Sequence, residues 1–128
     1  MRWLGIDPGT KRVGLAICDP DEKIAVPLEI VPASAAFPAV RSIAAREDVG
    51  GIVVGLPLLM DGDEGKSAAM ARKLGERLER QLELSVEYED ESLTSVEAER
   101  GGRGEPRDDI AAALILQQFI DRRRQESS

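Results

Sequence analysis

Short apolar runs separated by polar turns fill the first quarter of the chain. Residues 2–7, 13–18 and 23–31 have the composition of strands, and the turns between them are brief. Connections of this length favour an antiparallel meander of three strands. Because Pro27 cannot donate to a ladder, it predicts that the third strand lies at an edge or carries a bulge.

A helix and then a buried strand are predicted next. Pro38 fits the first turn of a helix that runs to about Asp48, and Gly50 and Gly51 then end that helix. Residues 52–56 are apolar without interruption. Such a run indicates a strand buried on both faces, as in a parallel sheet covered by helices.

The second half of the chain predicts one long amphipathic helix and a fifth strand. After a loop over 57–65, apolar residues recur every four positions among charged ones, at Met70, Leu74, Leu78 and Leu82. Residues 84–88 alternate as a strand does, and they are followed by three consecutive acids, 89–91. We therefore expect the order β-β-β-α-β-α-β up to this point.

Two further helices complete the predicted order. Residues 92–100 indicate a short helix, and 101–106 indicate a partly basic loop. A final helix begins at Asp108 or Asp109 and runs to about Arg124, apolar all round in its first half. Its basic end, 122–124, fits a solvated helix terminus favoured by the helix dipole better than a nucleic-acid contact.

Composition limits the chemistry that is open to this chain. Its 128 residues fit one domain spanning 1–128, with no apolar run near the ~20 residues of a membrane span and no signal peptide, so we expect a cytoplasmic protein. Cys18 is alone and lies in an apolar run, which predicts a core residue. The absence of histidine excludes Ser-His and Cys-His catalysis and any His-containing zinc site.

The charge balance bears on nucleic-acid binding. With 24 acidic and 17 basic residues, the net charge of -7 argues against broad electrostatic attachment to nucleic acid. A local basic strip is still compatible with it, because the field depends on how charges are distributed.

Carboxylates at the ends of predicted elements are the candidate chemistry. Asp7 ends the first strand, Asp90 and Glu91 follow the fifth, and Asp108 and Asp109 begin the last helix. If strands one, four and five are adjacent and parallel, the first three emerge at one sheet edge, and a helix crossing the sheet could bring Asp108 there. Clustered carboxylates suit Mg²⁺ or Mn²⁺, which support phosphodiester cleavage. Each acid alone also fits a plainer role, as a turn residue, a solvated loop or a helix cap.

Four segments make the chain resemble a known family. They are similar, in order, to signature segments of the YqgF/RuvX family, and together they span almost the whole chain: DPGTKRVGLA (7–16), VGLPLLMDG (54–62), DESLTSVEA (90–98) and DDIAAALILQ (108–117). The resemblance implies an α/β, RNase H-like fold with a mixed five-stranded sheet, antiparallel over strands 1-2-3 and parallel over 1-4-5, and helices on both faces. It also implies a metal-dependent nuclease that matures the 5′ end of pre-16S ribosomal RNA, with Holliday junction resolution as the alternative.

The resemblance assigns roles to residues of this chain. Asp7, Glu91 and Asp108 match the catalytic acids, and Asp7, Asp90, Glu91 and Asp108 the metal ligands for Mg²⁺ or Mn²⁺. The residues expected to contact the substrate are Thr10, Lys11, Arg12, Thr94, Arg103 and Arg107. The implied partners are precursor rRNA or branched DNA and ribosomal particles, with no membrane, for a monomer or homodimer.

The chain departs from the family pattern at three places. Ser92 stands where an Arg is usual, Leu59 where an Asn is common, and the 100–107 connection is shorter than in many relatives. These differences affect substrate contacts more than the acids.

Two other classes of function remain open at this point. Asp7 to Thr10 also resembles the first phosphate loop of sugar kinases and actin-like ATPases, but those proteins close two lobes over the nucleotide and 128 residues supply one. A non-catalytic nucleic-acid-binding module is favoured by the negative charge and Ser92, and opposed by the retained acids.

Overall fold

A five-stranded mixed sheet forms the centre of the computed structural model, which describes residues 1–57, 64–91 and 108–126. The strands, in the order β3-β2-β1-β4-β5 across the sheet, are β3 (Ala25–Pro32), β2 (Arg12–Cys18), β1 (Trp3–Asp7), β4 (Gly51–Leu56) and β5 (Ser85–Asp90). β1, β2 and β3 pair antiparallel, whereas β4 pairs in parallel with both β1 and β5. The predicted fold class is confirmed.

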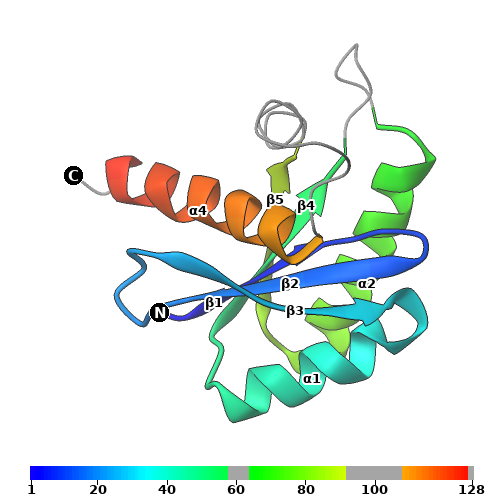
Figure 1. The fold of residues 1–128 in the computed structure, drawn as a ribbon, viewed down its shortest axis with the longest axis horizontal. Helices are drawn as coiled ribbons and strands as arrows, with labels where there is room; N and C mark the ends of the chain where they lie inside the picture. The colour runs from blue at the N-terminus through cyan, green and yellow to red at the C-terminus, as the bar shows by residue number, and fades with distance from the viewer. Residues whose placement is uncertain (58–63, 92–107, 127–128) are drawn as a thin grey trace.

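Helices cover both faces of this sheet. The chain leaves β3 through a short 3-10 turn, η1 (Ala33–Ala35), into α1 (Ala36–Arg46), and α2 (Lys66–Leu82) connects β4 to β5. The last helix, α4 (Asp108–Glu126), crosses the opposite face, in front of the strands in Figure 1. Among the helices in the described part of the chain, none is long and apolar enough to cross a membrane.

Strand alternation divides the core into two layers. Leu4, Ile6, Leu15 and Val54 belong to the layer under α1 and α2. Under α4 the sheet presents smaller or flatter residues, and these pack with the helix's apolar side chains: Trp3, Ala16, Cys18 and Val53 with Ala112, Ile115, Leu116, Phe119 and Ile120. Cys18 is 2% exposed, as predicted for a core residue.

The two properties predicted from Pro27 are both present. β3 is an edge strand, and its register with β2 shifts between Leu15 and Ala16, where Glu29 and Pro27 are the successive partners. The extra residue is a β-bulge that accommodates a residue without a backbone N–H.

Two element-level predictions need correction. The α2 helix exists, but its fully buried positions are Ala68, Ala71, Gly75 and Leu78, while Met70 is 49% exposed. Small residues face the sheet because the helix approaches it closely: a Cβ on Gly75 would lie 2.3 Å from the Tyr88 hydroxyl oxygen. Strand five ends in the acidic cluster as predicted, but Asp90, expected after the strand, is its last residue. The helix and loop expected over 92–106 lie outside the described residues.

Candidate active site

Asp7 and Glu91 meet at the carboxyl-terminal edge of the parallel strands. Asp7 is the last residue of β1, and β4 and β5 run in the same direction beside it. The Glu91 N–H donates to the Leu56 carbonyl at 3.3 Å, which holds the chain just past β5 against the end of β4. The two acids are 84 positions apart in sequence, yet their side chains share a hydrogen bond.

Glycines make room for these carboxyl groups under α4. Gly14 lies opposite Asp7 on β2, and a Cβ there would come within 1.9 Å of the Asp108 carbonyl oxygen. On β4, a Cβ at Gly55 would lie 2.6 Å from Oε2 of Glu91 and 2.6 Å from Cδ1 of Ile115. The missing side chains let the start of α4 approach the sheet and leave space for an acid beside Asp7.

The proximity of the two acids alters their ionisation. Burial, the hydrogen bond with Asp7 and the charges of Asp7 and Asp90 raise the pKa of Glu91 to about 9. Burial also raises the pKa of Asp7, and the charge of Asp108 adds to this, while the hydrogen bond with Glu91 acts in the opposite direction. In this arrangement a protonated Glu91 donates to an ionised Asp7.

Asp108 joins the cluster through the helix that it begins. It is the first residue of α4, and its carboxylate forms an ion pair with Arg12, with Nε and Oδ2 at 2.9 Å. Within the ranges that the structure describes, no three acidic or thiol side chains converge as a ready-made metal cage. The structure brings Asp7 and Glu91 together at one edge, and Asp108 lies near enough for its charge to act on Asp7 but pairs with Arg12.

Asp90 occupies a different position from its neighbours. Glu89 contacts α4, and Glu91 lies against Gly55 and Ile115 under the same helix. Since successive strand residues point to opposite faces, Asp90 belongs to the face covered by α1 and α2. This placement fits the predicted role of a metal ligand less well for Asp90 than the placement of Glu91 does for Glu91.

The predicted substrate contacts are divided between two sides of the β1–β2 turn. Thr10 and Lys11 are exposed on the turn, and Thr10 lines a pocket toward α2. Arg12, at the start of β2, reaches Asp108 on the α4 side. Thr94, Arg103 and Arg107 lie outside the described residues.

A polar network that the sequence interpretation missed supports the strand that leads to Glu91. Glu89 is 6% exposed, accepts a hydrogen bond from Gln118 Nε2 at 2.6 Å and is bound by Arg122. The Gln118 amide also donates to the Asp90 carbonyl at 3.2 Å. The spacing of Gln118 and Arg122, four residues apart on the last helix, was the available signal.

The same helix end forms a second contact with the body of the protein. Arg123 pairs with Glu22 at 2.9 Å and lies 5.0 Å over the Trp3 ring. The helix end over 122–124 is largely exposed, as predicted, and the sequence interpretation missed only that Arg122 and Arg123 also fix α4 through these contacts.

Comparison with known proteins decides the family. A sequence model described as RuvX, Holliday junction resolvase, matches residues 1–122. The chain belongs to the RuvX family. RuvX proteins similar to it include one from Chloroflexus aggregans, 41% identical over 94% of both chains, and one from Anaeromyxobacter sp., 45% identical over 96% of this chain and 98% of the relative. Both carry the name "Putative pre-16S rRNA nuclease".

Solved structures share the fold at low sequence identity. Thermus thermophilus RuvC, solved in complex with a Holliday junction substrate, matches this RuvX chain with a TM-score of 0.64 at 16% identity, covering 98% of this chain and 96% of that one. The fowlpox virus Holliday junction resolvase matches with a TM-score of 0.55 at 11% identity, over 95% of this chain and 99% of the other. The architecture described above is therefore that of the RuvC-like fold.

Proposed function

We propose that this RuvX protein is a divalent-metal-dependent nuclease that matures the 5′ end of pre-16S rRNA in the cytoplasm. The observation that carries the proposal is the hydrogen-bonded pair of Asp7 and Glu91 at the carboxyl-terminal sheet edge, with Asp108 near enough for its charge to act on Asp7. The family membership and the names of the relatives supply the reaction and the RNA. Precursor rRNA, within ribosomal particles, is the partner that this function requires.

The residues at this edge fit a divalent cation in kind. They offer carboxylate oxygens, which Mg²⁺ and Mn²⁺ prefer, and the space kept by Gly55 holds an oxygen of Glu91. Burial is the main cause of the raised pKa values of Asp7 and Glu91, and neighbouring carboxylate charges add to it, so a bound cation would offset a cost that these acids carry. Asp7, Glu91 and Asp108 would hold the ion, which when bound would supply an activated water and stabilise the leaving oxygen.

The residues at this edge would have different roles in positioning the ion, the attacking water and the phosphate. Asp7 is fixed by the β1 ladder and Asp108 by the start of α4, so both are positioned on rigid elements. Glu91, just past a strand end, would ligate or orient the attacking water. Lys11 is exposed on the β1–β2 turn, where it can reach the phosphate of a bound strand. Arg12 would be able to do so once its ion pair with Asp108 is exchanged.

Holliday junction resolution is the second candidate, favoured by the similarity of the fold to RuvC. A resolvase that cuts two strands symmetrically is expected to be a two-fold dimer, whereas an RNA-processing enzyme can act as a monomer. Incubation of the purified protein with Mn²⁺ and either a pre-16S rRNA fragment or a four-way DNA junction separates the two.

Replacement of Asp7 tests the nuclease proposal directly. We expect Asp7→Asn to reduce Mn²⁺-dependent cleavage by roughly a hundredfold or more, because it removes a charged oxygen ligand, and to leave the fold intact. Asp21→Asn, at an exposed turn position, is the matched control and should cleave as the wild type does. Full activity of Asp7→Asn would refute the assignment.

A further inference from the structure

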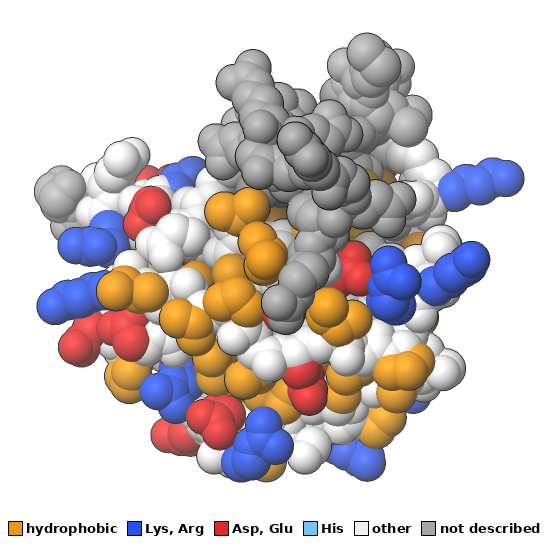
Figure 2. Space-filling view, viewed as in Figure 1, with side chains coloured by type: hydrophobic (Ala, Val, Ile, Leu, Met, Phe, Trp, Pro, Cys, Tyr) orange, Lys and Arg blue, Asp and Glu red, His pale blue; other side chains and the backbone are white. Residues whose placement is uncertain are grey.

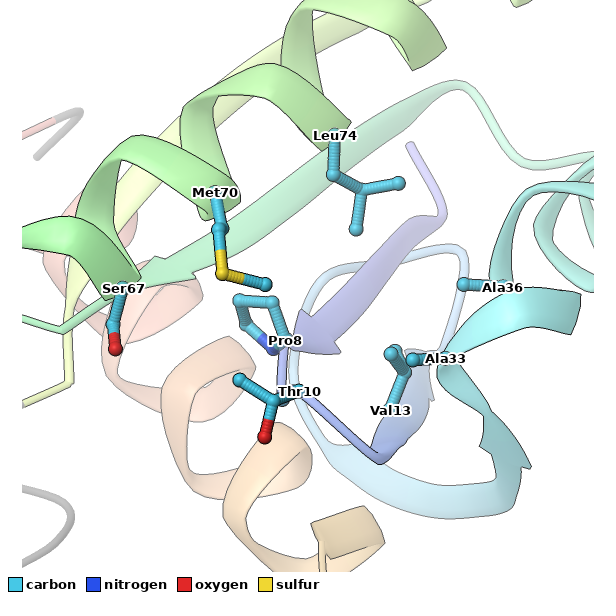
Figure 3. A pocket seen from close by; sticks show the side chains of 9 residues that line it. Pro8, Thr10, Val13, Ala33, Ala36, Ser67, Met70 and Leu74 are labelled. Carbon is cyan, nitrogen blue, oxygen red and sulfur yellow. The ribbon is translucent and has the colours of Figure 1, made fainter.

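A small pocket lies on the other side of the β1–β2 turn from the acids. It begins with Pro8, the residue after Asp7, and continues through Gly9 and Thr10. Gly9 is required here because a Cβ would come within 2.3 Å of the Arg12 carbonyl oxygen. In Figure 3, Ser67, Met70 and Leu74 of α2 form one wall, facing Pro8 and the Val13, Ala33 and Ala36 side. The pocket is therefore one residue removed from a candidate catalytic acid.

The lining defines what this pocket can accept. Its floor is apolar, with Val13 and Ala36 buried, and its polar side chains are the hydroxyls of Thr10 and Ser67. None of the lining residues in the described part of the chain is charged, so these residues favour an uncharged group over a bare phosphate or a cation. The volume is about 170 Å³, below the roughly 300 Å³ at which pockets for drug-sized ligands begin. An uncharged, flat ring with a polar edge fits both constraints.

Charges outside the pocket are placed for a nucleic-acid backbone. Lys11 follows Thr10 and Lys66 precedes Ser67, and both lysines are exposed. Ser67 also lies in the first turn of α2, where the helix dipole favours acceptor groups such as the carbonyl of a base. An apolar slot with two hydroxyl groups can bury the face of a base and bond to its polar edge, and the lysines next to Thr10 and Ser67 in the sequence offer cations for the neighbouring phosphates.

We infer that this pocket binds one unstacked nucleobase of a single-stranded segment whose backbone crosses the β1–β2 turn beside Asp7. The inference rests on the proposed nuclease function for the presence of a strand at this edge. Holding one base would fix the register of the strand, and so determine which phosphodiester bond reaches Asp7 and Glu91. Thr10, predicted as a substrate contact, would then contact the base rather than the scissile phosphate.

Binding of short oligonucleotides tests the pocket independently of cleavage. The probes are fluorescein-labelled RNA and DNA hexamers, intact or with one abasic sugar at each position in turn, measured by anisotropy in Ca²⁺, with a gel confirming that they stay intact. For the wild type we expect one abasic position to weaken binding by about tenfold, since burial of one base against the apolar lining contributes on that order. Weaker binding at one abasic position, in the RNA hexamer or in the DNA hexamer, supports the pocket. The hexamer that shows this effect identifies whether the base comes from RNA or from DNA.

A pair of serine variants locates the effect. Ser67→Leu fills the pocket, so we expect the intact hexamer to bind about tenfold more weakly and the abasic position to have no further effect. Ser42→Leu, at an exposed position of α1 outside the lining, should keep the wild-type profile. The methyl resonance of Met70 should shift with the intact hexamer and not with the sensitive abasic one.

Several results would overturn the inference. One is an equal loss of affinity for the hexamer at every abasic position, and another is that no hexamer binds. The others are that Ser67→Leu binds the intact and abasic hexamers as the wild type does, or that Ser42→Leu loses as much affinity as Ser67→Leu. Wild-type cleavage of pre-16S rRNA in Mn²⁺ is measured separately. If the protein cleaves the RNA but every abasic position weakens hexamer binding equally, the pocket is refuted and the nuclease proposal stands. If one abasic position weakens binding but no cleavage occurs, the pocket stands and the nuclease proposal is refuted.

Discussion

At the scale of single residues, the informative feature is the pair formed by Asp7 and Glu91. Each was identifiable in the sequence as an acid at the end of a strand, but neither position by itself indicates a shared proton. The hydrogen bond exists because parallel pairing through β4 puts both strand ends at one edge, and because Gly55 leaves space for the glutamate. The roles of these acids in catalysis and metal binding stay predictions.

The raised pKa of Glu91 predicts how stability depends on pH. Below its unfolded value of 4.5, Glu91 is protonated in both states; as pH rises toward about 9, only the unfolded chain loses the proton. The metal-free protein should therefore lose stability over this window. We expect Glu91→Gln to be more stable than the wild type by a few kcal/mol at pH 8 and equal to it near pH 4, measured by urea unfolding in EDTA.

Two comparisons make this measurement specific. Glu87→Gln changes an exposed glutamate of the same strand and should follow the wild-type pH profile. Saturating Mg²⁺ should raise the unfolding free energy of the wild type more than that of Glu91→Gln, because the ion binds the ionised pair. Parallel profiles for the wild type and Glu91→Gln would show that the pKa of Glu91 is not raised in the folded protein.

At the scale of elements, α4 organises the site. Its first residue supplies Asp108, its middle packs on the small residues of β1 and β2, and its end holds Glu89 through Gln118 and Arg122. A charge at position 89 is tolerated at 6% exposure only because the helix brings a cation to it. This explains why β5 continues into residues whose composition indicates a solvated loop.

Removal of the Arg122 side-chain charge should destabilise the protein, because it leaves the buried Glu89 without its cation. We expect Arg122→Met to lower the free energy of unfolding by about 1–2 kcal/mol, less than for a fully buried pair because Arg122 is 50% exposed. Arg124→Met, two residues on and exposed, is the control and should change stability by less than about 0.5 kcal/mol.

A double-mutant cycle separates this charge effect from lost packing. In the Glu89→Gln background, where no buried charge needs a partner, Arg122→Met should cost much less than it does in the wild type. Equal costs in the two backgrounds would mean that Arg122 acts through its other contacts, with the Phe119 ring and Glu126.

At the scale of the whole molecule, charge distribution sets the conditions for substrate binding. The net charge is -7, and on the face shown in Figure 2 lysines and arginines are scattered among acids instead of forming one patch. The candidate active edge itself carries Asp7, Glu91 and Asp108. A polyanion would approach this edge with favourable energy only after a cation had reduced its charge.

RNA binding should consequently require a divalent ion. We expect a labelled pre-16S fragment to bind at least about tenfold more weakly in EDTA than in Mg²⁺, measured by anisotropy. NaCl at matched ionic strength is the control, since it screens charge without occupying the acids. Recovery of full binding in NaCl alone would mean that screening, and not a bound cation, is what the edge requires.

The sequence by itself determined the elements and the family. Hydrophobic periodicity located the five strands and three of the helices, Pro27 indicated the bulged edge, and the acids stood out because they follow apolar runs. These features are local: they depend on backbone preferences and on residues a few positions apart.

Only the tertiary structure decided how distant residues meet. Periodicity does not indicate that Glu89 is buried against Arg122, that small residues of α2 face the sheet, or that Asp7 shares a hydrogen bond with Glu91. The last two depend on close approaches to the sheet, which the glycines at positions 75 and 55 allow through contacts with residues distant in the sequence. Packing at van der Waals distance determined the site, and sequence spacing does not encode that distance.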